Sequence, residues 1–125
     1  MDVQRVPAAT GGSYSDVVSV SGPGRWVHVS GQVAFSPDGT VRGSMEGQAH
    51  GCFDHIERAL EKVGGSLSHV VRITTFITNL AEYDGFSRAR AARFSGHLPA
   101  SAAVQVAGLL ADAQIEIDAV AFIPD

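Results

Sequence analysis

Ser101 and Glu116 are the two residues whose types and positions most clearly suggest chemistry. Both lie in the closing stretch, residues 98–123, which reads as two strands joined by a loop. Glu116 interrupts an otherwise alternating apolar strand, and burying a carboxylate is costly unless a partner or a function compensates. In a partly dry cleft such a carboxylate can take a proton from water as a general base.

The polar groups expected near this pair indicate that the substrate or ligand is a small polar compound. Ser30, the Gly31 amide and Ser101 can donate hydrogen bonds to a carbonyl or imine substituent. With Glu116 as base, this set suits hydrolysis at a C=N carbon or tautomerisation of an enamine. The same set of groups equally suits binding of a small polar ligand without any reaction. The structural alternative for Glu116 is a position at a contact between subunits, where it pairs with an arginine.

Composition indicates one globular domain over residues 1–125. Hydrophobic residues make up 45% and charged residues 18% of the chain, and the net charge is −4. Without a Lys/Arg cluster, a nucleic-acid partner is not expected. Cys52 is the only cysteine, which favours a reducing compartment and hence the cytoplasm. The N-terminal stretch lacks the apolar region of a secretory signal, and no apolar run has membrane-spanning length, so no membrane partner is expected.

Hydrophobic periodicity predicts the elements that must position these residues. Residues 1–13 are expected to be irregular, and strands at 16–21 and 25–35 are expected to pair as a hairpin across the Gly-Pro-Gly turn. Apolar residues at helical spacing predict a helix over 46–63, stopped by Gly64-Gly65. A β-branched strand over 69–78, a second helix over 81–93 and the two closing strands follow.

This order predicts an α+β fold in which both helices cover one face of a single sheet. The other face would be mixed in character, too apolar for a solvent face and too polar for a core. We therefore expect contact with another subunit there. The residues expected on this face are Trp26, His28, Ser30, Arg72, Thr74, Phe76, Glu116, Asp118, Val120 and Phe122.

Other candidate residues favour structural roles. His50 and Asp54 share a helix face, but His55 lies off it, so no metal site is expected. Cys52 falls on the apolar stripe of the first helix, where an inert core thiol is expected. The second helix carries three arginines that we expect on a solvated face, namely Arg88, Arg90 and Arg93.

Three segments together resemble the RidA/YjgF/UK114 family of enamine and imine deaminases. They are VSGQV at 29–33, VVRITTFITNLAEYDGF at 70–86, and LPASAAVQVAGLLADAQIEIDAVAFI at 98–123. The resemblance implies a chorismate-mutase-like fold and a homotrimer, with the sheets forming an inner barrel. Clefts between subunits would hold small imine, enamine or carbonyl compounds, with no metal or cofactor. Some members carry an endoribonuclease label, which the acidic composition here does not support.

The activity implied is hydrolysis of 2-imino or 2-enamino acids to 2-keto acids and ammonia. By match to the family motifs, Glu116 would orient the water. Ser101 stands where the deaminase branch has an arginine that clamps the substrate carboxylate, and Ser87 and Ala103 stand where many members have asparagine and cysteine. The positions that match the family's substrate contacts are Tyr14, Ser30, Gly31, Ser87 and Ser101.

The absent arginine leaves three functions open. The first is a deaminase from an arginine-lacking branch, the second a non-catalytic trimer that binds a small ligand or regulates a partner, and the third a pathway deaminase of aminomuconate type. Strand alternation places Arg72 on the same face of the sheet as Glu116, where it is one candidate to replace the absent arginine. Ser101→Arg is expected to restore carboxylate binding if the cleft is otherwise intact.

Overall fold

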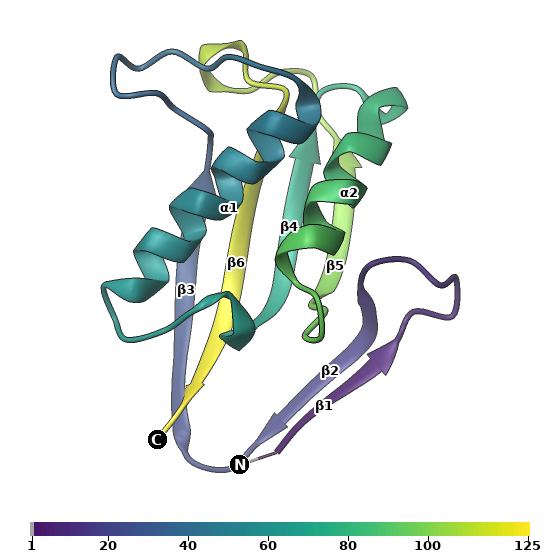
Figure 1. Ribbon diagram of the computed structural model, residues 1–125, viewed down its shortest axis with the longest axis vertical. Helices are drawn as coiled ribbons and strands as arrows, with labels where there is room; N and C mark the ends of the chain where they lie inside the picture. The colour runs from purple at the N-terminus through teal and green to yellow at the C-terminus, as the bar shows by residue number, and fades with distance from the viewer. Residues whose placement is uncertain (1) are drawn as a thin grey trace.

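The chain folds as one sheet with two helices packed on it (Figure 1). The structure is a computed structural model that describes residues 2–125. The strands are β1 (Asp2–Pro7), β2 (Ser15–Ser21), β3 (Gly24–Gln32), β4 (Val70–Ile77), β5 (Ala100–Gln105) and β6 (Ile115–Pro124). The helices are α1 (Met45–Glu61) and α2 (Tyr83–Arg93), with single 3-10 turns at η1 (Leu67–His69), η2 (Leu80–Glu82) and η3 (Leu110–Asp112).

The sheet order is β1-β2-β5-β4-β6-β3, which corrects the predicted early hairpin. β2 and β3 follow each other in sequence but lie far apart in the sheet. β2 pairs antiparallel with β1, whereas β3 pairs antiparallel with β6 at the opposite edge. The Gly-Pro-Gly segment therefore joins the two sides of the sheet and does not close a tight hairpin.

The predicted irregular lead-in was also wrong, because Asp2–Pro7 forms β1. Met1 lies outside the described residues. The β1–β2 ribbon is held to the main sheet by one parallel pairing, Ser15 with Ala100. It therefore curves away from the other strands, at the lower right of Figure 1.

The helix over residues 45–61 forms for the reasons that its sequence suggests. The Ser44 hydroxyl accepts a hydrogen bond from the Gly47 amide at 3.1 Å, capping the first turn. Gly64 takes a φ of +81°, and the Gly65 amide bonds to the Leu60 carbonyl at 2.9 Å. This is the predicted glycine stop. The predicted helix over 46–63 extends too far at its end, because Val63 lies beyond α1 and is exposed.

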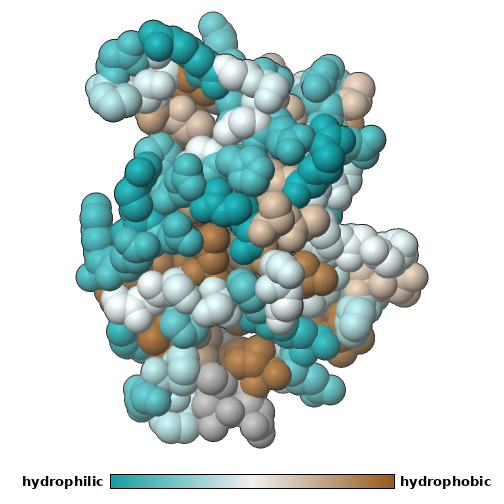
Figure 2. Space-filling view, in the orientation of Figure 1, coloured by the Kyte–Doolittle hydropathy of each residue, from teal (hydrophilic) through white to brown (hydrophobic). Residues whose placement is uncertain are grey.

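The core lies between the sheet and the two helices, as the alternation predicted. Its centre contains apolar residues of α1, α2, β4 and β6, including Phe53, Ile56, Ile73, Phe86 and Ile117. Figure 2 shows this helix-covered side of the molecule, where hydrophilic side chains cover most of the two helices. None of the described helices is long and apolar enough to cross a bilayer.

The opposite side of the sheet, called here the open face, is mixed as predicted. Trp26 is 55% exposed although its ring meets Phe122 edge to face at 5.0 Å, and Val104 is 46% exposed. Polar residues of β3, β4 and β6 lie between these apolar ones. The α+β fold with both helices on one face is therefore confirmed.

Candidate functional site

Three of the candidate residues meet on the open face, where β3 pairs with β6. The register passes from Val29 opposite Ala119 to Gln32 opposite Ile117, so Ser30 and Gly31 together oppose the single residue Asp118. Such a β-bulge puts an extra residue into one strand and changes the direction of its side chains. Glu116 points to the same face.

Gly31 and Glu116 lie in direct contact at this bulge. A Cβ placed on Gly31 would come within 2.5 Å of the Oε2 atom of Glu116. Glycine is thus required by close approach, since a side chain here would displace the carboxylate. The set of Ser30, Gly31 and Glu116 is called the first half-site below.

Glu116 has no cationic partner among residues 2–125. Pairing with an arginine of the same chain is therefore not the reason for its presence. The charge of Glu116 does affect Cys52. The pKa of the Cys52 thiol is raised to about 12, mainly by burial and secondly by the charge of Glu116. This agrees with the predicted inert core thiol, since the thiolate is the reactive form.

Of the remaining candidates, Tyr14 and Ser101 contact the guanidinium of Arg90, and Ser87 is linked to it only through Ser13. Arg90 Nη1 donates to the Ser101 hydroxyl at 3.0 Å, and its Cζ lies 5.1 Å from the centre of the Tyr14 ring. The Ser13 hydroxyl accepts from Arg90 Nε at 3.0 Å and donates to the Ser87 carbonyl at 3.2 Å. Tyr14, Ser87, Ser101 and Arg90 are called the second half-site.

Arg90 was predicted on a solvated face, and that prediction was wrong. Its residue is only 2% exposed, whereas Arg88 is exposed and pairs with Glu46 at 2.7 Å. The sequence did contain a signal for this burial. Arg90 lies seven residues after Tyr83 and four after Phe86, on the stripe by which α2 contacts the sheet.

The two half-sites lie on opposite sides of the sheet within one chain. Ser101 is in register with Ile73, a core residue beneath the helices, whereas Glu116 is in register with Phe76 on the open face. Arg72 lies on the Glu116 face as predicted, since it is in register with Ala100 and Val120. It therefore points away from Ser101 and does not take the place of a cation there.

No group of His, Cys, Asp and Glu residues suited to a metal ion occurs within residues 2–125. Asp54 of the His50 cluster instead pairs with Arg93, with Arg93 Nη2 at 2.8 Å from its Oδ1. Arg93 Nη1 donates to the His50 carbonyl at 3.1 Å. These contacts tie α1 to α2 and account for the polar residues on this flank.

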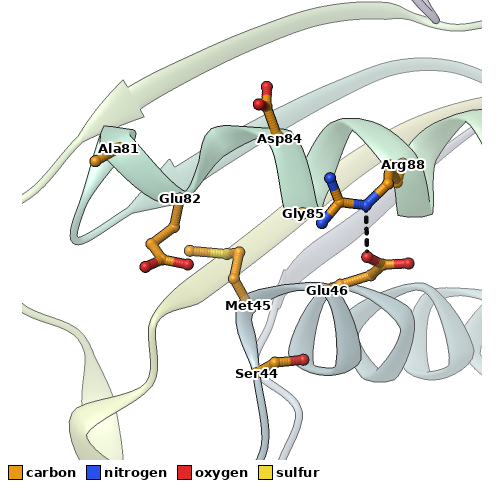
Figure 3. Close-up of a pocket in the computed structure, with 8 residues that line it drawn as sticks. All are labelled: Ser44, Met45, Glu46, Ala81, Glu82, Asp84, Gly85 and Arg88. Atoms are coloured by element: carbon orange, nitrogen blue, oxygen red, sulfur yellow. Dashed lines mark hydrogen bonds and ion pairs between the residues drawn. The ribbon is translucent and has the colours of Figure 1, made fainter.

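A surface hollow of about 310 Å³ contains none of the candidate residues. It lies between the first turns of α1 and α2 (Figure 3). Figure 3 shows Arg88 reaching across to Glu46, while Asp84 points away from α1. In this hollow Arg88 is already paired with Glu46, and the two half-sites remain the candidate functional site.

Chemically, the first half-site offers a carboxylate beside an exposed hydroxyl and a strand bulge. The second offers a cation surrounded by hydroxyl groups and aromatic rings. The first can accept a proton from water, and the second can hold a polar or anionic group.

Known proteins resemble this chain along nearly its whole length. The family model described as Endoribonuclease L-PSP matches residues 4–123. Protein DfrA of Myxococcus xanthus is 35% identical over 112 residues, which are 88% of this chain and 85% of that protein. A rat protein named 2-iminobutanoate/2-iminopropanoate deaminase is 31% identical over 123 residues, covering 97% of this chain and 87% of its own.

A solved structure gives the same result for the fold. The crystal structure of RidA from the Antarctic bacterium Psychrobacter superimposes with a TM-score of 0.75 at 35% identity, and the match covers 97% of this chain and 98% of that one. The resemblance found in the sequence motifs is thus confirmed by the family model, the relatives and the fold. The chain belongs to the RidA/YjgF family of Endoribonuclease L-PSP proteins.

Proposed function

We propose that this chain hydrolyses small imine or enamine compounds to a carbonyl product and ammonia, with Glu116 as the base that orients water. The observation that carries the proposal is the Gly31 bulge, which brings backbone and carboxylate together on an exposed face. The name of the rat relative supports the same reaction class.

The proposed reaction forms one C–O bond and breaks one C–N bond. An enamine first gains a proton at carbon and becomes an imine. Water then adds to the imine carbon while Glu116 takes a water proton. Glu116 passes this proton to the nitrogen. The new hydroxyl group then gives up its own proton, which also reaches the nitrogen through Glu116, so that the C=O bond forms, the C–N bond breaks and ammonia leaves. The step is a hydrolysis and needs no oxidant or reductant.

We also propose that the active assembly is a homotrimer in which each cleft takes one half-site from each of two neighbouring subunits. The two half-sites face opposite sides of the sheet in one chain, so they do not form one cleft alone. The exposed apolar residues of the open face, such as Trp26 and Val104, provide a surface for such contact.

Turnover of freshly generated imines tests the reaction. A pyridoxal-phosphate lyase can release 2-aminoacrylate in situ, and its decay is followed with and without the protein, beside a panel of uncharged imines. We expect acceleration that Glu116→Gln abolishes and Asp118→Asn retains, since Asp118 is a carboxylate on the same face of the same strand. No acceleration of any compound in the panel would contradict the proposal.

A non-catalytic binding trimer is the second candidate, and the serine at position 101 favours it. In that case Glu116→Gln changes the affinity for a carbonyl ligand, and there is no turnover to lose. The same panel therefore separates the two candidates.

A further inference from the structure

Another hollow lies where the β1–β2 ribbon meets the segment that follows α2. Its volume is about 230 Å³, and its lining residues are Arg5, Pro7, Ser15, Gly96 and Leu98. These residues belong to neither half-site. The ribbon joins the rest of the sheet through a single strand pairing, which includes Ser15. A compound in this hollow therefore contacts both parts of the chain.

Arg5 gives this hollow a positive charge without a counterion in the described part of the chain. No ion pair among the side chains of residues 3–125 includes Arg5, which is half-buried. Burial lowers the pKa of Arg5, and burial first and the charge of Arg5 second lower the pKa of His97. Both shifts agree with a cation whose charge is not neutralised. Because desolvation of an unpaired charge is costly, an anion in the hollow would stabilise Arg5.

One N–H group of Arg5 remains available to a ligand. Nη1 donates to the Leu98 carbonyl at 2.8 Å and to the Val70 carbonyl at 3.3 Å. Nη2 donates to the Ser68 carbonyl at 3.2 Å and to the Val70 carbonyl at 3.3 Å. The two Nη atoms thus use their four hydrogens, whereas the Nε–H group has no acceptor within residues 3–125. One oxygen of an anion can accept from Nε, but the two-oxygen fork of a free guanidinium is not available.

The remaining walls of the hollow are mainly apolar. Pro7 and Leu98 contribute their side chains, and Gly96 has none that would fill the space. The Ser15 hydroxyl donates to the Leu98 carbonyl at 2.6 Å, so its hydrogen is not available to a ligand. A volume of about 230 Å³ lies below the roughly 300–1,000 Å³ of sites for drug-sized compounds. The hollow therefore suits a small compound with one anionic group and a short apolar tail.

The single free donor favours a carboxylate over a phosphate. A phosphate group has three strong acceptor oxygens and carries up to two charges, so it is best bound by several N–H donors. Arg5 offers one such donor, and the apolar walls offer none. A carboxylate needs fewer partners, since it carries one charge and two oxygens.

We propose that this hollow binds a small carboxylate with a short branched apolar tail, at a site separate from the two half-sites. The carboxylate accepts a hydrogen bond from Arg5 Nε, and the tail contacts Pro7 and Leu98. The proposal goes beyond the function proposed above and does not depend on it.

Binding in this hollow affects the second half-site through the chain. Ser13 and Tyr14 come directly before Ser15, and both contact the Arg90 guanidinium. A ligand that joins the ribbon to the segment after α2 therefore limits the movement of these two residues. The occupied hollow holds the second half-site in one arrangement, so this ligand acts as a regulator and not as a substrate.

Calorimetry with three probes on the full chain tests the site. Isovalerate has both the charge and the tail, isovaleramide has the tail alone, and acetate has the charge with only one methyl group. We expect isovalerate to bind roughly tenfold more tightly than isovaleramide, because a hydrogen bond to a charged group is lost in the amide. We expect a similar factor over acetate, because acetate lacks the apolar tail. Equal affinity for isovalerate and either of the other probes overturns the proposal, as does tighter binding of inorganic phosphate.

Arg5→Met should make the affinities for isovalerate and isovaleramide equal. Arg25→Met is the matched control, because Arg25 also donates to a main-chain carbonyl, that of Val63 at 2.6 Å, but does not line the hollow. It should keep the preference for isovalerate. Persistence of the preference in Arg5→Met, or its loss in Arg25→Met, overturns the proposal.

Arg5→Met also removes contacts that hold the ribbon, so two measurements use the unchanged protein. The Nε–H signal of Arg5 in NMR spectra should shift with isovalerate until saturation and stay fixed with isovaleramide. Amide exchange should slow in β1 and β2 when isovalerate is bound, because the ligand stabilises the contacts between the ribbon and the body. An Arg5 signal that ignores isovalerate overturns the proposal. Slower exchange around Glu116 with no change in β1 and β2 also overturns it, since the ligand would then bind at the first half-site.

Discussion

Gly31 contacts the carboxylate of Glu116 so closely that a Cβ at position 31 would lie 2.5 Å from Oε2. The contact joins the two strands at the bulge, where Ser30 and Gly31 oppose Asp118. The backbone at Gly31 therefore limits where the carboxylate can be, while Glu116 remains without a cationic partner among residues 2–125.

Gly31→Ala is expected to displace the Glu116 carboxylate and to lower turnover by about ten- to hundredfold, the usual effect of a misplaced catalytic group. Its cost in stability should stay within about 1–3 kcal/mol, because the end of a flexible side chain can move aside. Gly108→Ala is the matched control, since a Cβ there meets nothing within 4 Å. Turnover of the imine panel and urea unfolding measure both effects. A Gly31→Ala protein with full turnover would contradict the positioning role of Gly31.

Arg5 holds the β1–β2 ribbon to the rest of the molecule. Its guanidinium donates to the Leu98 carbonyl at 2.8 Å, to the Ser68 carbonyl at 3.2 Å and to the Val70 carbonyl at 3.3 Å. Burial lowers the pKa of Arg5 from its ordinary value. These bonds matter because β2 has a single pairing with β5.

We expect Arg5→Met to cost about 1–3 kcal/mol of unfolding free energy, because it leaves partly buried carbonyls without donors. Amide exchange should accelerate in β1 and β2 more than in β4 and β6. Arg42→Met is the control, since Arg42 forms an exposed ion pair with Asp38 that should contribute under about 1 kcal/mol. Equal loss of stability in both variants would mean that Arg5 does not anchor the ribbon.

Local signals predicted most of the elements, whereas the errors involved partners distant in sequence. The α1 stripe and the alternation of β4 and β6 follow from periods of 3.6 and 2 residues, which neighbouring residues carry. The pairing of β3 with β6 joins residues that are 85 (Gln32 with Ile117) to 100 (Gly24 with Pro124) positions apart, and the turn between β2 and β3 resembles a hairpin turn. β1 was not predicted because its six residues alternate only weakly between apolar and polar. Its position depends instead on pairing with β2 and on the hydrogen bonds of its own Arg5.

The site was predicted as a set of residues but not as an arrangement. Ser30, Gly31 and Glu116 do meet, but they meet through the long-range pairing of β3 with β6 and the bulge within it, which local patterns do not show. Ser101 does not share the face of Glu116, because the parallel register with β4 places it opposite Ile73, on the helix side of the sheet. Arg90 was overlooked because a charged residue was assigned to the surface, although its helical position matched the buried stripe.

Val104→Asp is expected to weaken the proposed trimer. Val104 is in register with Phe76 and lies exposed on the open face, so a charge there would be desolvated in a subunit contact. Val63→Asp is the control, since Val63 is similarly exposed but follows α1 on the helix side. Light scattering at several protein concentrations should show dissociation to smaller species for Val104→Asp alone. A trimer that persists in Val104→Asp would place the subunit contact elsewhere.

His97 is expected to make stability depend on pH. Burial first and the charge of Arg5 second lower the pKa of His97 from its ordinary value of 6.5. Below pH 6.5 the unfolded chain therefore binds a proton that the folded chain does not, so stability falls as the pH falls toward the folded pKa. Above pH 6.5 both states are neutral at this residue, and its contribution is constant.

His97→Gln should accordingly flatten the fall in unfolding free energy as the pH is lowered below 6.5. Arg5→Met should flatten it only in part, because burial, the larger cause, remains when the neighbouring charge is removed. Urea unfolding of the three proteins at closely spaced pH values provides the comparison. If the profiles of the unchanged protein and of His97→Gln run parallel over this range, His97 has the same pKa in the folded and unfolded states, which would contradict the prediction. A His97→Gln profile that is flatter than that of Arg5→Met supports burial as the larger of the two causes.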